Sequence, residues 1–205
     1  MDNTNNTNNT NVIDTTDTTA NHLEQFATAM VICAAVDGVL MGSGALYHFL
    51  SKRSRTPVWQ NNDWDIFCLN SFNTRGAPLD KRLDFIQEKL KAVLGPSATF
   101  ERKSHACCQV NYKNAKYDVV ATCFDDIDKL FDRFDLNICC IATNVIGTVF
   151  GKQFNADAAL GSIPCTYNVN AARTPQIKDE RIAKYKSRGY CIAEVDGIKY
   201  DFTYN

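Results

Sequence analysis

The 205-residue sequence lacks three features that would each have assigned it to a class of protein. It has almost no net charge, because 22 Lys and Arg stand against 23 Asp and Glu, and this excludes a strongly basic nucleic-acid coating protein. No apolar run approaches the ~20 residues that a membrane span needs, and the longest covers only residues 30–36. The N-terminus has no positively charged segment followed by an apolar one, so we expect no secretory signal, no membrane partner and a cytoplasmic location.

Patterns typical of zinc or thiol chemistry are missing as well. The three histidines, His22, His48 and His105, lie far apart in the sequence and show no metal-like spacing. Among the nine cysteines, Cys107–Cys108 and Cys139–Cys140 are adjacent pairs, and no C-x-x-C spacing occurs. Because neighbouring residues on a strand point to opposite faces, these adjacent cysteines do not form a zinc-binding motif. An odd number of cysteines in apolar segments of an intracellular chain predicts free thiols, mostly buried.

The part of the sequence that comes first is a polar tail. Asn and Thr supply thirteen of residues 1–20. Such a segment cannot bury enough apolar surface to offset the entropy lost on ordering, so we predict that it is disordered. The chain as a whole is 45% apolar and 22% charged, the balance of a globular protein. We therefore expect a disordered tail over residues 1–20 and a single domain over residues 21–205.

Helical and strand-like patterns alternate along residues 21–205. The spacing of apolar residues predicts helices at 21–36, with Asn21 as the cap, and at 45–50, 78–94, 124–134 and 179–187. Strands are predicted at 39–41, 64–69, 107–112, 117–121 and 136–142, with a final hairpin over 191–204. Because hairpins alternate with helices, the pattern favours an α+β fold with a mixed sheet flanked by helices.

The first candidate site is a pair of acids, Asp63 and Asp65, in a strand-like segment. Residues i and i+2 of a strand point to the same face, so the two carboxylates should project together. Like charges side by side are unfavourable, and a divalent cation removes that cost. Carboxylate oxygens suit Mg²⁺, which keeps positions open for substrate phosphates. The alternative interpretation is a pair of exposed acids at a strand edge.

A glycine-rich turn, Gly42–Gly44, follows the predicted strand 39–41 and precedes a predicted helix. Glycine lets the backbone turn tightly and approach a ligand closely. A helix N-terminus offers free N–H groups and the positive end of the helix dipole, which together suit a phosphate. Gly42 and Ser43 are therefore candidate nucleotide-binding residues. The alternative is that glycine serves only the geometry of the corner between strand and helix.

A third carboxylate would complete a site for two cations, the arrangement that holds the attacking and leaving oxygens in phosphoryl transfer. Asp135 opens the predicted strand 136–142. It would lie ~4.8 Å from the acidic pair if that strand neighbours the strand of Asp63 and Asp65. Asp118, in the predicted strand 117–121, is an alternative for the same role.

The predicted helix 179–187 carries a basic face. Arg181, Lys184, Tyr185 and Arg188 follow i, i+3, i+4 and i+7 spacing and so lie on one side of the helix. Such a face could bind a triphosphate or an RNA backbone, and Arg181 and Lys184 are our candidates for nucleotide binding. The alternative is a solvated surface helix with Tyr185 packed inward.

In their order along the chain, these elements resemble the nucleotidyltransferase-fold superfamily, which includes polymerase-beta-like, poly(A)-adding and CCA-adding enzymes. A narrower resemblance is to poorly characterised nucleotidyltransferase-like proteins of large DNA viruses, phages and fungi. The resemblance covers residues 38–190 and depends on short motifs: Gly42-Ser43-x-Ala45-Leu46, Trp59 ahead of Asp63-x-Asp65-Ile66-Phe67, Phe134-Asp135-Leu136, and Arg181-Ile182-x-Lys184-Tyr185-x-x-Arg188-Gly189-Tyr190.

The resemblance implies a nucleotidyltransferase-like fold and a metal-dependent transferase. Such an enzyme moves a nucleoside monophosphate from an NTP, for example ATP, to a hydroxyl acceptor and releases pyrophosphate. By the same resemblance, Gly42 and Ser43 bind the triphosphate, while Asp63, Asp65 and Asp135 hold Mg²⁺, or Mn²⁺ in its place, and are catalytic. The acceptor stays open between RNA, a protein and a small molecule, and a viral member would act inside the host cell.

The sequence departs from the family pattern at two places. The stretch between Ser43 and Asp63 is longer than in compact members and carries the basic residues Lys52, Arg53 and Arg55. After Asp135 we expect no separate helical domain that would bind the nucleobase. An alternative function is therefore a catalytically inactive module that binds RNA or a protein partner, although the intact acids argue against loss of the site. The oligomeric state is open.

Overall fold

The computed structural model describes residues 15–53, 57, 59–61, 63–70, 76–168 and 175–195. The helices are α1 (Thr15–Val36), α2 (Gly42–Ser51), α3 (Leu79–Leu94), α4 (Ile127–Phe131), the 3₁₀ helix η2 (Asn137–Cys139), α5 (Ala156–Ala159) and α6 (Pro175–Ser187). The strands are β1 (Gly38–Met41), β2 (Asp63–Cys68), β3 (Thr99–Arg102), β4 (Cys107–Tyr112), β5 (Ala115–Ala121), β6 (Ile141–Thr143), β7 (Thr148–Phe150), β8 (Cys165–Asn168) and β9 (Ile192–Val195).

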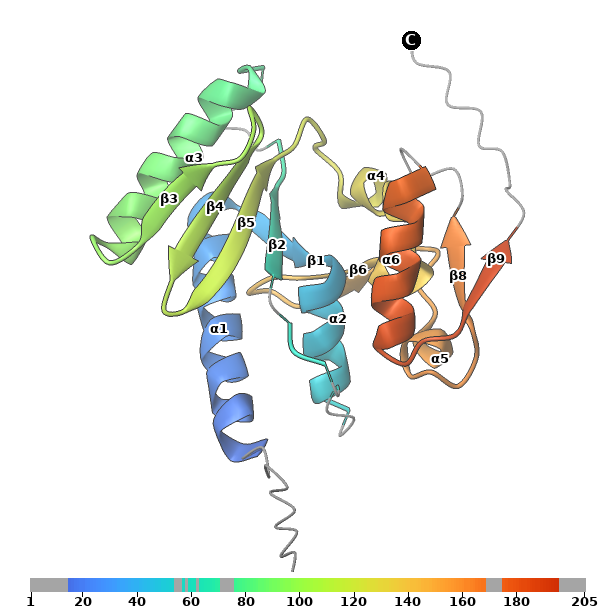
Figure 1. Cartoon of the computed structure of the whole chain (residues 1–205). Helices are drawn as coiled ribbons and strands as arrows, with labels where there is room; N and C mark the ends of the chain where they lie inside the picture. Colours follow the sequence, from blue (N-terminus) through green and yellow to red (C-terminus); the bar gives the residue numbers. More distant parts are fainter. Residues whose placement is uncertain are drawn as a thin grey trace, which may run out of the picture.

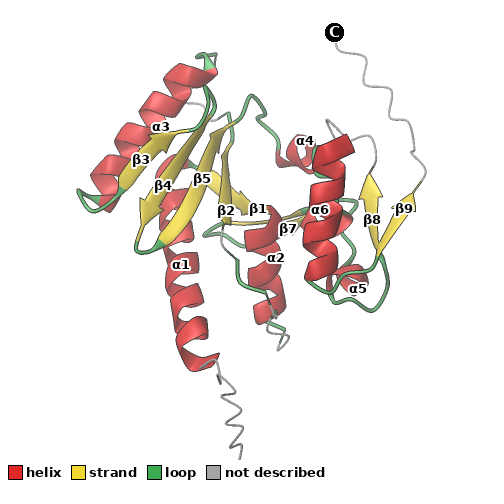
Figure 2. Ribbon diagram, viewed as in Figure 1, coloured by secondary structure: helices red, strands yellow, loops and turns green. Residues whose placement is uncertain are grey.

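Seven of these strands form one mixed sheet in the order β3-β4-β5-β2-β1-β6-β7 (Figure 1). Only the central pair β2 and β5 is parallel, and the other neighbours run antiparallel. The strands β8 and β9 form a separate parallel pair beside α6 (Figure 2). The predicted α+β fold with a mixed sheet and flanking helices is confirmed.

The main hydrophobic core lies between the sheet and helices α1, α2 and α3. Strand β2 alternates in burial along its length, with Trp64, Ile66 and Cys68 buried and the residues between them only partly covered. Trp64 and Ile66 belong to the same core cluster as Ile32 of α1 and Leu83 of α3. The strict alternation follows from the two-residue period of a strand and fixes Asp63, Asp65 and Phe67 on the opposite face.

A second, smaller hydrophobic cluster covers part of that opposite face. Val39 and Met41 of β1 pack with Leu130 and Phe131 of α4, and Phe67 borders the cluster. The residues of this cluster lie toward the later part of β2, since Phe67 pairs with Val39 in the β1–β2 register. The acids at the start of β2 therefore lie beside this apolar cover.

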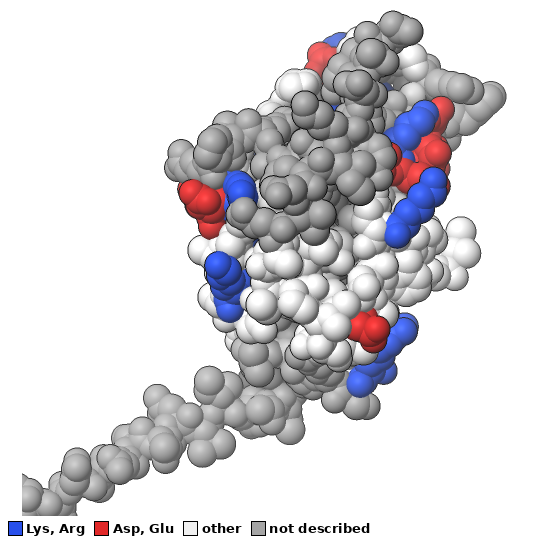
Figure 3. Space-filling model, turned by 90° about the vertical axis from the view of Figure 1, so that its right-hand side faces the viewer, with Lys and Arg blue, Asp and Glu red and all other residues white. Residues whose placement is uncertain are grey.

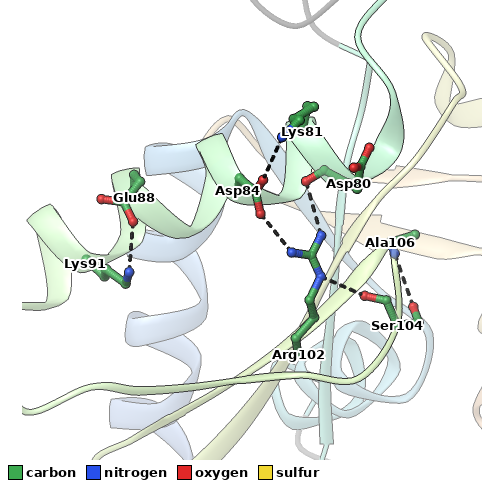
Figure 4. Close-up of polar contacts among 8 residues, drawn as sticks. All are labelled: Asp80, Lys81, Asp84, Glu88, Lys91, Arg102, Ser104 and Ala106. Carbon is green, nitrogen blue, oxygen red and sulfur yellow. Dashed lines mark hydrogen bonds and ion pairs between the residues drawn. The ribbon is translucent and has the colours of Figure 1, made fainter.

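Polar contacts attach helix α3 to the sheet. Arg82, which is only 2% exposed, donates to the backbone carbonyls of Thr122 and, at 3.0 Å, of Leu69. These carbonyls lie just beyond the ends of β5 and β2. On the surface, Arg102 of β3 reaches the Asp84 carboxylate at 2.8 Å and the Asp80 carbonyl at 3.2 Å (Figure 4). Together these contacts fix α3 across one half of the sheet.

Two predicted helices have other bounds in the structure. Helix α1 begins at Thr15 rather than at Asn21. The Asn21 side chain accepts a hydrogen bond from Gln25, one turn later, so it lies inside the helix. The predicted helix 124–134 shortens to α4, Ile127–Phe131, with Asp126 as its cap. Helical propagation costs little once the later turns are packed, which accounts for the longer α1.

The predicted strand 136–142 is also wrong for most of its length. Residues 137–139 form η2, and only Ile141–Thr143 enter the sheet as β6, beside β1 rather than β2. An apolar run that is buried on all sides has no period that distinguishes a strand from a compact turn. For the predicted final hairpin, β9 pairs in parallel with β8, and residues 196–205 lie outside the described residues.

Other expectations are confirmed. Strands β4 and β5 form the predicted hairpin, with Lys113 and Asn114 at positive φ in its two-residue turn. All nine cysteines are free thiols, and six of them are buried. None of the helices in the described ranges is long and apolar enough to cross a membrane. The predicted disordered tail over residues 1–20 is wrong for residues 15–20, which form the first turns of α1, and its residues 1–14 lie outside the described residues.

Candidate active site

Three carboxylates lie on the open face at the centre of the sheet. Asp63 and Asp65 are two residues apart on β2, and their side chains project to the same side, as predicted. The parallel register pairs Asp65 with Asp118 of β5, so these two acids are direct neighbours across adjacent strands. Gln109 of β4 donates a hydrogen bond of 3.0 Å to the Asp118 carboxylate and holds it in place.

The electrostatics of Asp65 reflect this crowding. Its pKa is raised to about 6, first by burial and then by the charges of Asp118 and Asp63. Two cations, Lys184 and Arg181 of α6, oppose the rise. A carboxylate that is partly buried among like charges gains stability when a cation approaches it, because the cation removes the repulsion.

The glycine turn lies against the same carboxylate. Gly42 has a φ of +67°, and a Cβ added there would lie 3.6 Å from Oδ2 of Asp65 and 3.3 Å from the ring of Phe134. The turn therefore depends on glycine for its conformation, and a side chain there would also crowd the Phe134 ring. Helix α2 begins at this glycine, and no side chain caps it and no acid lies in its first turn. Its first N–H groups and the buried Ser43 thus start beside Asp65.

Helix α6 contributes the positive charge. Arg181 and Lys184 are the predicted basic residues, and both act on the charge of Asp65. Tyr185 is packed inward, only 1% exposed, as the alternative reading of the helix expected. Arg188 lies over the Trp59 ring, 3.9 Å from its centroid. The basic face is thus divided, and its middle portion faces the acids.

Asp135 does not join the three carboxylates of the sheet. Its predicted role requires that its strand neighbour β2, but the neighbours of β2 are β1 and β5, so that condition is not met. Asp135 lies in the connection before η2, is 6% exposed, and forms an ion pair with Arg181. The strand that does neighbour β2 carries Asp118, the alternative considered from the sequence.

A polar cavity opens next to Asp63. It has a volume of about 350 Å³ and is lined by Gln25, Asn61, Asp63, Asn114, Ala115 and Lys116. Asn61 is fixed there by a 2.8 Å hydrogen bond from its amide nitrogen to the Asp63 carbonyl. Sequence reasoning missed this cavity, because its residues come from α1, the segment before β2 and the β4–β5 hairpin. The one signal in the sequence is the spacing of Lys116 and Asp118, which are two residues apart on β5 and so point to the same face of the sheet.

The residues present fit a magnesium ion that is bound together with its substrate. Within the described part of the chain, no three His, Cys, Asp or Glu side chains are already gathered around a point where a metal ion could sit. Mg²⁺, however, is commonly held by one or two carboxylates and completed by substrate phosphates and water. The adjacent Asp65 and Asp118, with Asp63 beside them, offer those oxygens and gain from the positive charge.

The outer surface near α6 has no continuous basic patch among the described residues visible in Figure 3. Lys and Arg side chains stand apart on that face, separated by uncharged and acidic residues.

The comparisons with known proteins agree with this geometry at the level of the fold. No protein-family model matches the sequence, and no curated protein matches it. Among solved structures, the Thermotoga maritima CCA-adding enzyme complexed with tRNA is similar with a TM-score of 0.53 and 17% identity, over 84% of this chain and 39% of that chain. CCA-adding enzyme complexes with CTP and with ATP give TM-scores of 0.54 and 0.53, at 15% and 17% identity, over 87% and 84% of this chain.

The likeness covers only part of those enzymes. The chain spans 43% of the CTP-complex enzyme and 40% of the ATP-complex enzyme. CCA-adding enzymes belong to the polymerase-beta-like nucleotidyltransferase superfamily. Together with the mixed sheet and the glycine turn beside the acids, the likeness leads to one conclusion about architecture: this chain has the nucleotidyltransferase fold.

Proposed function

We propose that the protein is a metal-dependent nucleotidyltransferase that transfers a nucleoside monophosphate from an NTP to a hydroxyl acceptor. The proposal depends on one observation: a helix N-terminus lies directly beside a cluster of carboxylates. The Gly42 turn, which starts an uncapped helix, approaches the Asp65 carboxylate, which neighbours Asp118 and Asp63. Helix N–H groups suit phosphates, and clustered carboxylates suit Mg²⁺.

The chain's own residues have distinct parts in this proposal. Gly42 and Ser43 bind the outer phosphates, while Lys184 and Arg181 neutralise their charge from the opposite side. Asp63, Asp65 and Asp118 are the residues that would hold Mg²⁺ or Mn²⁺. When bound, the ion supplies charge neutralisation and polarises the reacting oxygens. Asp118 replaces Asp135 as the third carboxylate in our proposal, because it is the acid that pairs with Asp65 in the sheet.

The reaction balances without any further reactant. The acceptor oxygen forms a bond to the α-phosphorus, the bond from that phosphorus to the β-phosphate oxygen breaks, and pyrophosphate leaves. The proton of the acceptor hydroxyl passes to a carboxylate of the cluster or to water. The polar cavity beside Asp63 offers a route by which a hydroxyl group could reach the acids. Positioning and charge neutralisation would supply most of the rate enhancement.

The test is calorimetric titration of the full chain with each of the four NTPs in the presence of Mg²⁺. The same titration is made with the double variant Asp63→Asn/Asp65→Asn, and with Asp157→Asn on α5 as an exposed acidic control. We expect binding of at least one NTP that requires both the metal and the two acids, and that the control retains. Full binding by the double variant would overturn the site.

Activity is measured by transfer of an α-³²P-labelled nucleotide to total RNA, to protein and to small hydroxyl compounds. Transfer should fall by more than about 100-fold in the double variant. NTP binding without transfer to any acceptor class would favour the inactive binding module instead.

A further inference from the structure

The role of Asp135 can be inferred from how helix α6 is attached to the rest of the domain. Its carboxylate is buried and forms an ion pair with Arg181 near the middle of α6. The other carboxylate oxygen, Oδ1, is buried and has no hydrogen-bond partner among the residues that the structure describes. The side chain of Arg181 is 34% exposed, whereas that of Asp135 is 9% exposed. The arginine is therefore partly accessible to solvent while its partner acid is buried.

The backbone fixes the position of that acid. The carbonyl of Asp135 accepts a hydrogen bond of 2.6 Å from the N–H of Asn168, at the end of β8. The next residue, Leu136, forms an isolated antiparallel bridge with Tyr167 of the same strand. Residues 135 and 136 are therefore attached through their backbone to one strand, β8, so the position of Asp135 does not depend on its contact with α6 alone.

A second attachment lies one turn along the helix. The hydroxyl of Tyr185 is 2.9 Å from Sγ of Cys139, on η2, and both groups are buried. Arg181 and Tyr185 are four residues apart and so lie on the same side of α6. Between these two anchors lies Lys184, which is exposed. Lys184 and Arg181 are the two cations whose charge acts on Asp65.

Asp118 and Asp63 are the acids that raise the pKa of Asp65, and Asp135 lies on neither of the strands that carry them. Its neighbour Phe134, in contrast, lies against the glycine turn, since its ring is 3.3 Å from the Cβ position of Gly42. The segment around Asp135 thus borders the site without contributing its carboxylate to the acidic cluster. The carboxylate is instead directed to Arg181.

We propose that Asp135 is a positioning residue, which holds Arg181 and so sets α6 at the place where Arg181 and Lys184 face the triphosphate. This inference depends on the proposed function and deepens it. It assigns the metal to the acids of the sheet and the orientation of the basic helix to Asp135.

Two binding measurements on the full chain separate this role from that of a metal ligand. Mn²⁺ binding is followed by electron paramagnetic resonance, and binding of the preferred NTP with Mg²⁺ by calorimetry. For Asp135→Asn we expect Mn²⁺ affinity within about twofold of the wild type and NTP affinity lowered roughly 10-fold. For Asp65→Asn we expect loss of Mn²⁺ affinity itself. Asp132→Asn, an exposed acid on the same segment, should alter neither.

A double-mutant cycle of Asp135→Asn with Lys184→Ala distinguishes a positioning role from a general effect on stability. In the wild type, Lys184→Ala should weaken NTP binding several-fold. In the Asp135→Asn background, the same change should have little further effect, because Lys184 no longer faces the phosphates. Asp135→Glu, which keeps the charge, should restore part of the loss.

The outcomes separate the two proposals. If Asp135→Asn weakens Mn²⁺ binding as much as Asp65→Asn does, Asp135 is a ligand and the positioning role is overturned, while the proposed function stands. If Asp135→Asn changes neither affinity, or if Lys184→Ala has its full effect in that background, the positioning role is also overturned. If the wild type binds neither Mn²⁺ nor any NTP, the proposed function fails. Should Asp135→Asn not fold, Asp135→Glu is used in the same two assays: NTP affinity should fall, though less than 10-fold, with Mn²⁺ affinity within about twofold of the wild type, and an unchanged NTP affinity would overturn the positioning role.

Discussion

Asp65 of β2 and Asp118 of β5 are register partners in the only parallel pair of the seven-stranded sheet. Each therefore places a negative charge next to the other on the open face. The pKa of Asp65 is raised to about 6 by burial and by Asp118 and Asp63. The repulsion between the two carboxylates lowers the free energy of unfolding of the metal-free protein and favours the binding of a cation.

The first prediction concerns the free energy of unfolding without metal. A carboxyl with a raised pKa binds protons more readily in the folded state, so its ionisation above pH 6 destabilises the fold. Asp65→Asn should therefore stabilise the metal-free protein at pH 8, by on the order of 1–3 kcal/mol, and abolish nucleotide transfer. Urea unfolding at pH 8 in EDTA measures the effect. Asp157→Asn is the control, and a loss of stability in Asp65→Asn would contradict the proposed repulsion.

The second prediction concerns Asp118. Replacing it by Asn removes one of the charges that raise the pKa of Asp65, so that pKa should fall toward the ordinary range. The pKa of Asp65 can be measured in EDTA from the pH dependence of the NMR shifts of the aspartate side-chain carboxyl carbons. The Mn²⁺ affinity of the same variant should fall ~10-fold or more, because the variant lacks one of the three carboxylates that we propose as metal ligands. An unchanged Mn²⁺ affinity would remove Asp118 from the metal site and leave Asp63 and Asp65 alone there.

The third prediction concerns two buried histidines, His22 of α1 and His48 of α2. Burial lowers the pKa of each to about 4, so both are neutral in the folded protein at pH 7. The unfolded chain takes up protons near pH 6.5, so stability should fall as the pH drops from 6.5 toward 4 and level off below. A shift of this size corresponds to at most roughly 3 kcal/mol for each histidine.

Urea unfolding between pH 4 and pH 8 measures this dependence. His48→Gln should flatten it by about half, whereas His105→Gln, an exposed histidine, should leave it unchanged. A profile that keeps its full slope in His48→Gln would assign the acid sensitivity to other groups.

The fourth prediction compares two glycines. Gly42→Ala imposes a side chain at a φ of +67° and 3.3 Å from the Phe134 ring, so it should cost roughly 1–2 kcal/mol of stability and weaken NTP binding. Gly147→Ala meets no atom within 4 Å and should be close to neutral in both assays. Thermal unfolding and NTP calorimetry would record the two effects. Equal behaviour of the two variants would argue that the turn has no special role.

Local patterns in the sequence predicted correctly where several candidate residues lie. The i, i+2 spacing of Asp63 and Asp65 placed both acids on one face, because the period of a strand leaves no other arrangement. The order of strand, glycine turn and helix placed Gly42 and Ser43 at a helix start, which the structure also has. Arg181 and Lys184 were expected on one helix face, and both act on Asp65.

The choice between Asp118 and Asp135 could not be made from the sequence. Each acid lies next to an apolar run that reads as a strand, and local periodicity does not say which strands become neighbours. The run after Asp135 is buried on all sides, so it could form η2 as readily as a strand. Strand pairing is a long-range property, and it placed β5 beside β2.

The sequence by itself thus determined the elements with a strong local period: the acidic strand, the glycine turn and the basic helix. It also excluded a long apolar span and a heavily charged chain. Only the tertiary structure decided which acid adjoins Asp65, where α6 is anchored, and that a cavity opens beside Asp63. The physical reason is that side-chain direction follows from backbone geometry within one element, whereas contacts between elements follow from packing of the whole core.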